Sequence, residues 1–201
     1  MAVNANRTTN RLDVSSFDGT NVIPGGEIAY LSDIPPAPSN NLDLAVAVLS
    51  SSTGQTGAPS SFSSATAFSG ITINPLTTAA SQAKINSSNA SFTPTRTGFY
   101  RCVVAASFVG TGGVAKLEVG VASGSASGAK LIPADVVGCT VLAGSDSYGV
   151  IRSDTILYLT SGTAYFPFFQ ADSANSTATN ITMQQAGTQI TWQQMPTDQN
   201  Q

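Results

Sequence analysis

The chain has 201 residues, of which 41% are hydrophobic and only 9% are charged, and its 8 basic and 11 acidic residues give a net charge of −3. This length can bury a core, but the scattered basic residues exclude the clustered charge that phosphate binding needs, so we expect no nucleic-acid partner. No run approaches the roughly 18 apolar residues of a spanning helix, so we expect no membrane insertion.

The first 40 residues are expected to form an extended arm that ends in a proline-rich linker. Pro35-Pro36-Ala37-Pro38 favours an extended, semi-rigid backbone. The residues before it are polar with isolated apolar positions, too few to bury a core. Residues 1–11 also lack the apolar stretch of a secretion signal, which indicates synthesis in a cytoplasm. An arm of this kind needs a partner surface, and its candidate anchoring residues are Arg7, Arg11, Phe17, Tyr30, Leu31, Asp33 and Ile34.

Residues 41–201 are expected to form a second domain of short β-strands separated by Gly, Ser, Asn and Pro turns. Strand-like runs lie at 44–49, 99–109, 117–121, 136–143, 154–160, 164–169, 180–184 and 188–195. Period-two alternation predicts one buried face for each half-buried run, as in the last, where Ile190 and Trp192 share a face. Eight short strands without a clear helix predict an all-β sandwich or barrel.

The run at 164–169 differs because both of its faces are apolar. Phe166 and Phe168 lie on one face, and Tyr165 and Phe169 lie on the other. A strand buried on both faces needs a second cover, for which a neighbouring subunit is the favoured explanation and a long loop of the same chain is the alternative. Pro167 cannot donate a ladder hydrogen bond, so we expect it at an edge or a bulge.

Few residues could carry chemistry. The absence of histidine excludes Ser–His–Asp triads and nearly all zinc sites, so we expect no enzyme, no cofactor and no metal. Cys102 and Cys139 could form one disulfide, although cytoplasmic synthesis favours free thiols. The acidic residues could contribute to a calcium site, but solvated turn positions are the favoured interpretation because no dense Asp-x-Asp loop is present. These acidic residues are Asp135, Asp146, Asp154 and Asp172.

Three segments together resemble the C1q/tumour-necrosis-factor type of trimeric jelly roll. They are Asn89–Tyr100, with Phe92-Thr93-Pro94 and Gly98-Phe99-Tyr100; Leu157–Phe166, which departs from the family by carrying Thr163 where an acidic residue is common; and Thr188–Met195. The resemblance spans about residues 42–196. It implies a jelly-roll sandwich and a homotrimer held by aromatic residues near the threefold axis. By position these trimer-interface residues would be Tyr165, Phe166, Phe168 and Phe169.

A short element in the arm, Gly26–Pro35, is similar to one that recurs in tail-fibre and other appendage proteins of tailed bacteriophages. This resemblance implies a homotrimeric virion protein, made in the bacterial host cytoplasm. It would be a head fibre, a capsid decoration protein or a short tail fibre, attached to capsid or tail proteins through the arm. The alternative is a fibre tip that binds a host receptor or surface glycan through its loops, for example the loop that carries Tyr148.

Overall fold

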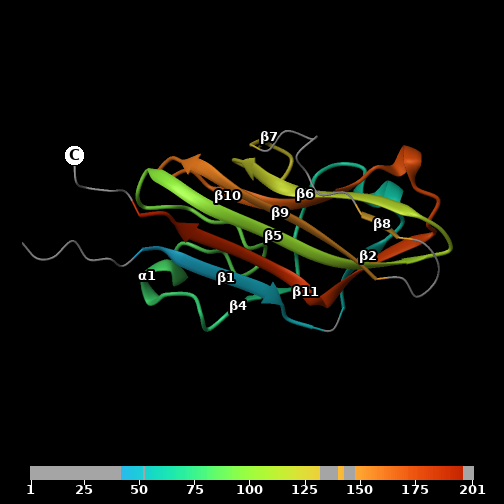
Figure 1. Cartoon of the computed structure of the whole chain (residues 1–201), viewed down its shortest axis with the longest axis horizontal. Coiled ribbons are helices and arrows are strands. Elements are labelled where there is room, and N and C mark those ends of the chain that lie inside the picture. Colours follow the sequence, from blue (N-terminus) through green and yellow to red (C-terminus); the bar gives the residue numbers. More distant parts are fainter. Residues whose placement is uncertain (1–41, 52, 132–139, 143–147, 197–201) are drawn as a thin grey trace, which may run out of the picture. The chain divides into compact units, whose positions relative to one another are not determined.

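A computed structural model describes residues 42–51, 53–131, 140–142 and 148–196 (Figure 1). The described residues belong to one compact unit that starts at Leu42. The boundary after residue 40 and the anchoring residues of the arm stay predictions, because residues 1–41 lie outside the described part. Cys139, Asp135 and Asp146 also lie outside it.

The first antiparallel sheet has the strand order β4-β1-β11-β5-β9, and β2 also pairs with β11. Its strands are β1 (Leu44–Leu49), β2 (Thr53–Gly57), β4 (Ile71–Ile73), β5 (Gly98–Thr111), β9 (Tyr148–Leu159) and β11 (Asn180–Gln194). In Figure 1, β1, β11 and β5 run side by side across the unit although they come from its beginning, end and middle. Such long-range pairing of non-consecutive strands is the connectivity of a jelly roll.

The second antiparallel sheet has the order β3-β10-β6-β7, with β8 also pairing with β6. Its strands are β3 (Thr66–Ala67), β6 (Ala115–Ser123), β7 (Ala129–Lys130), β8 (Thr140–Leu142) and β10 (Tyr165–Ala171). Three short helical turns accompany the sheets in the described part: η2 (Pro59–Phe62), α1 (Ala79–Gln82) and η3 (Ser173–Asn175). The sequence did not predict these turns or the short strands β2, β3, β4 and β7.

The alternation of the long strands is confirmed. The β5 residues predicted to share a face are all buried, as are those of β6 and β11, and together they form one core between the sheets. These residues are Cys102, Val104, Ala106, Phe108, Leu117, Val119, Val121, Ile190 and Trp192. The runs at 180–184 and 188–195 belong to one strand, β11, that a bulge interrupts. The connection from β5 to β6 at 112–114 contains Gly112 at φ +75°.

The segment before β5 closes one end of this core. Phe92 and Tyr100, on either side of the segment 94–98, are both fully buried. The Phe92 ring stacks on Trp192, with centroids 5.5 Å apart and an interplanar angle of 15°. Trp192 Nε1 donates a hydrogen bond to the carbonyl oxygen of Ala90 at 3.0 Å, so the buried indole keeps its polar group paired.

Candidate interaction surface

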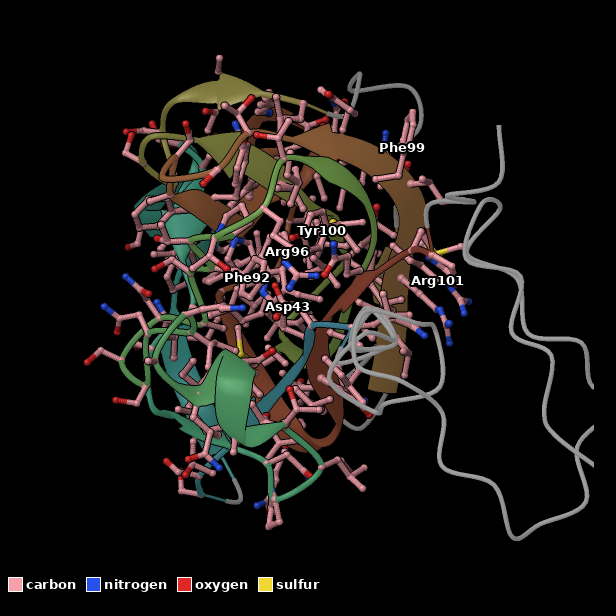
Figure 2. All side chains as sticks on the ribbon, turned by 90° about the vertical axis from the view of Figure 1, so that its left-hand side faces the viewer. Asp43, Phe92, Arg96, Phe99, Tyr100 and Arg101 are labelled. Carbon is pink, nitrogen blue, oxygen red and sulfur yellow. The ribbon has the colours of Figure 1, made fainter. Side chains whose placement is uncertain are left out.

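Strand alternation turns a second set of side chains outward from the first sheet. On β5 and β9 these residues lie in facing pairs, because Phe99 pairs with Tyr158 and Arg101 pairs with Ile156. We call this surface the β5/β9 face; it consists of Phe99, Arg101, Val103, Ala105, Arg152, Asp154, Ile156 and Tyr158. Figure 2 shows Phe99 and Arg101 pointing outward while Tyr100, between them in sequence, points inward.

One end of the β5/β9 face is apolar and open to solvent. The exposed fractions are 52% for Phe99, 56% for Ile156 and 62% for Tyr158. The rings of Phe99 and Tyr158 meet edge to face, with centroids 5.2 Å apart. Large apolar side chains that are exposed together on one sheet face mark an interaction surface more often than singly exposed ones do.

The middle of the β5/β9 face carries a charged cluster. Arg101 donates two hydrogen bonds to Asp154, from Nε to Oδ1 at 2.8 Å and from Nη2 to Oδ2 at 2.6 Å. Arg152 Nη2 donates a third to Oδ2 at 2.8 Å. The hydrogen bonds from Arg101, and then the one from Arg152, hold the pKa of Asp154 well below its usual range. Two guanidinium groups share one carboxylate, so the cluster has a net charge of +1.

The four residues predicted at the trimer interface lie on β10, in the other sheet. Tyr165 and Phe169 point into the core of their own chain, where Phe169 contacts the rings of Phe62, Phe68 and Phe108. Phe168 is also fully buried, whereas Phe166 is half-buried. The interface role of these residues stays a prediction, but in a single chain only Phe166 among them keeps a partly open surface.

Phe168 is covered on the outer face of its sheet by its own chain. Its register partner on β6 is Gly120, which has no side chain to compete for the space. Lys130 lies over the ring, with Nζ 5.1 Å from the centroid. The ammonium group is held there by Gln170 Oε1 at 2.8 Å and by Glu118 Oε2 at 3.4 Å. Phe168 is therefore buried within a single chain, with the Lys130 ammonium over its ring.

Pro167 occupies the position on β10 that tolerates a missing N–H. One edge of β10 pairs with Phe92 at Tyr165, and the ladder with β3 begins only at Phe168. Pro167 falls between these two pairings, and its register partner is Val121 on the β6 side. Pro167 therefore lies where this edge of β10 has a gap in its pairing, which agrees with the predicted edge position.

A buried polar network lies beside the start of β1. Asp43 is 2% exposed and forms an ion pair with Lys84. Its Oδ1 also accepts a hydrogen bond from Ser81 Oγ at 3.2 Å, and its Oδ2 accepts one from the Tyr100 hydroxyl at 3.4 Å. Figure 2 shows Asp43 and Tyr100 among the inward-pointing side chains at this end of the sandwich, near Phe92 and Arg96. The carboxylate joins β1, the α1 region and β5.

The network predicts a loss of stability at alkaline pH. Burial, and then the negative charge of Asp43, raise the pKa of Tyr100 above its ordinary value of about 10. A raised pKa means that the folded state holds the phenolic proton more tightly, so this contribution to stability is complete below pH 10 and is lost above it. We expect the free energy of unfolding to fall by up to about 1.4 kcal/mol more per pH unit above pH 10 in the wild type than in Tyr100→Phe.

Urea unfolding at a series of pH values measures how the free energy of unfolding changes with pH in the wild type and in Tyr100→Phe. Burial also raises the pKa of the free thiol of Cys102, which adds an alkaline loss that begins near its ordinary value of about 8.5. That loss is common to the two proteins and cancels in the comparison. Equal slopes above pH 10 would contradict the assignment to Tyr100.

The acidic residues considered for a calcium site either have partners within the chain or lie outside the described residues. Asp172 accepts hydrogen bonds from the backbone and side chain of Asn175 and caps the N-terminal end of η3. No group of three or more Cys, Asp and Glu residues gathers as a potential metal site within residues 42–51, 53–131, 140–142 and 148–196. Among the same residues, no helix has the length and hydrophobicity to cross a membrane. The side chain of Tyr148 is not described.

Sequence reasoning missed the apolar end of the β5/β9 face. The signal was present at 156–159, where Ile156 and Tyr158 alternate with Leu157 and Leu159, so that both faces of the strand are apolar. The same doubly apolar pattern occurs in β10. Periodicity cannot tell which of two apolar faces points outward, and the structure resolves that choice.

No protein-family model matches the chain, and no curated protein matches it. Solved structures do. The TNF protein Eiger from S. frugiperda is 12% identical with a TM-score of 0.53, and the match covers 80% of this chain and 98% of that one. Murine APRIL is 13% identical with a TM-score of 0.48, covering 77% and 99%. The globular domain of zebrafish complement 1qA is 13% identical with a TM-score of 0.47, covering 78% and 99%. The two antiparallel sheets and the match to the Eiger TNF protein confirm the predicted all-β jelly-roll sandwich of the TNF type.

Proposed function

We propose that this chain is a non-enzymatic structural protein that assembles as a homotrimer through the apolar end of the β5/β9 face. In this proposal the trimer is a bacteriophage head fibre, decoration protein or tail fibre, which the N-terminal arm attaches to capsid or tail proteins. The observation that carries the assembly is the exposed group of Phe99, Ile156 and Tyr158 on one sheet face.

A second copy of the chain is the occupant that this surface favours. The trimeric family that the sequence resembles provides the geometry, and burial of aromatic side chains provides the free energy. The chain has few charges and many hydroxyl and amide groups. Such surfaces can be buried against another copy with hydrogen bonds and with little cost from unpaired ions. Within the charged cluster beside the apolar end, Arg101 and Asp154 already pair through two hydrogen bonds.

The attachment part of the proposal rests on the arm. Residues 1–40 contain the element Gly26–Pro35 that is similar to phage appendage proteins, and their sparse apolar residues need a partner surface. Deletion of residues 1–38 is expected to leave a soluble trimer that no longer binds virions. Co-sedimentation with particles that lack the protein measures this binding, with the full-length chain as control. A truncated trimer that still decorates particles would refute anchoring by the arm.

A further inference from the structure

The bulge in β11 lies at the end of the first sheet away from Phe99 and Tyr158. Gln184 pairs with Ser107, and the next register pair joins Gln189 to Ala105. Four residues of β11, 185–188, therefore lie opposite a single residue of β5. Bulges are enriched beside functional sites because they redirect side chains.

Hydrogen bonds fix the conformation of the bulge. The Thr188 hydroxyl donates a hydrogen bond to the Gln184 carbonyl oxygen at 2.6 Å and accepts one from the Ser107 N–H at 3.0 Å. Gly187 adopts φ +88°, and a Cβ there would lie 3.3 Å from Ser107 Cβ and 3.5 Å from Val150 Cγ2. Glycine thus allows the bulge to approach both β5 and β9 closely.

A hollow of about 510 Å³ lies beside this bulge. Its polar lining includes Arg152, Gln185 and Gln189, and its apolar lining includes Val48 and Ala105. This volume is within the range of sites for small ligands, which combine apolar surface with a few polar groups that orient the ligand. No Asp or Glu is among the described residues that line the hollow.

The electrostatics of the hollow favour an anion. The Arg152 side chain is 56% exposed, and one of its nitrogens, Nη2, donates to Asp154. A guanidinium has five N–H donors, so most of them remain for a ligand. Asp154 also receives both hydrogen bonds from Arg101, which leaves a net positive charge beside the hollow. Arginine binds carboxylates through paired hydrogen bonds.

We propose that this hollow binds a small sugar acid of the uronic-acid class. Its carboxylate would pair with Arg152, and the apolar face of its ring would lie on Val48 and Ala105. Its hydroxyl groups would donate to the side-chain amide oxygens of Gln185 and Gln189, because the amide nitrogens already donate to Leu49 O at 3.0 Å and to Thr191 Oγ1 at 3.2 Å. The site belongs to a single chain and does not rest on the trimer. A monomeric protein that binds through Arg152 would refute the proposed assembly and leave this site standing.

Calorimetric titration of the full-length protein with glucuronate, acetate and glucose tests the proposal. Glucuronate is expected to bind at least about tenfold more tightly than acetate or glucose, because only glucuronate offers both the carboxylate and the ring. Arg152→Gln is expected to weaken glucuronate binding at least about tenfold. Arg152→Lys should recover only part of the affinity, since an ammonium lacks the planar pair of donors.

Arg96→Gln provides the matched control. It removes the same charge from an exposed arginine in the turn before β5 and should leave the affinity unchanged. Equal affinities for glucuronate and acetate would overturn the sugar assignment. Absence of glucuronate binding, or an affinity that Arg152→Gln and Arg96→Gln lower equally, would overturn the site.

Discussion

The double variant Phe99→Thr/Tyr158→Thr is expected to convert the proposed trimer into monomers. Both rings are more than half exposed in a single chain, so their removal costs the fold little, and threonine keeps the β-propensity of the strands. In the trimer, each ring lost removes about 1.5 kcal/mol of burial, or about 9 kcal/mol for six rings. Since half-assembly of a trimer varies with the square root of its association constant, the half-assembly concentration should rise about a thousandfold.

Sedimentation velocity and native mass spectrometry distinguish three copies of the 20.5 kDa chain from one. The matched control is Leu76→Thr, which removes an apolar side chain that is 69% exposed outside the β5/β9 face. It should remain trimeric. A wild-type protein that is monomeric at high concentration, or a double variant that assembles like the wild type, would refute the proposed interface.

Replacement of Asp43 by Ala is expected to destabilise the folded domain by about 3 kcal/mol. The substitution removes the carboxylate that pairs with Lys84 and accepts from Ser81 and Tyr100. Lys84 has a side chain that is only 14% exposed, so its ammonium would lose its partner in a poorly hydrated place. The loss of a buried partner costs more than the net value of the pair, because the remaining charge is uncompensated.

Urea unfolding at one fixed protein concentration measures this change, since assembly makes stability depend on concentration. Lys84→Met supplies the second single variant of a double-mutant cycle, in which we expect a coupling free energy of about 2 kcal/mol. Glu118→Ala, which removes the carboxylate of the more exposed pair with Lys130, should cost less than about 1 kcal/mol. Equal effects of Asp43→Ala and Glu118→Ala would contradict the role of the buried network.

The long strands could be predicted from the sequence because their alternation is strong. In β5, β6 and β11 one set of positions is consistently apolar and becomes the core. The short strands could not be predicted for the opposite reason. Thr53–Gly57 contains only Thr, Gly and Gln and is a strand because it pairs with β11. Its structure depends on a partner more than 120 residues away in the sequence, which local propensity does not contain.

The surroundings of the apolar strand β10 could not be predicted from the sequence for a different reason. Tyr165, Phe166, Phe168 and Phe169 form an unusually apolar run, and the expectation that a neighbouring subunit covers it followed from strand periodicity. Coverage of Phe168 by Lys130 depends on the glycine across from it, a pairing that only the register specifies. The hollow beside Arg152 likewise depends on the bulge in β11. The sequence predicted two separate strands there, at 180–184 and 188–195, so the bulge was not predicted.

Trp192 is the single tryptophan of the chain, and it lies stacked on Phe92 inside the sandwich. Its fluorescence is therefore a built-in optical probe of the core. Unfolding should expose the indole and shift its emission to longer wavelength. Separation of the subunits of the proposed trimer should leave the emission unchanged, since the indole is buried on the inner side of the sheet. Folding and assembly can thus be followed independently in one unlabelled sample.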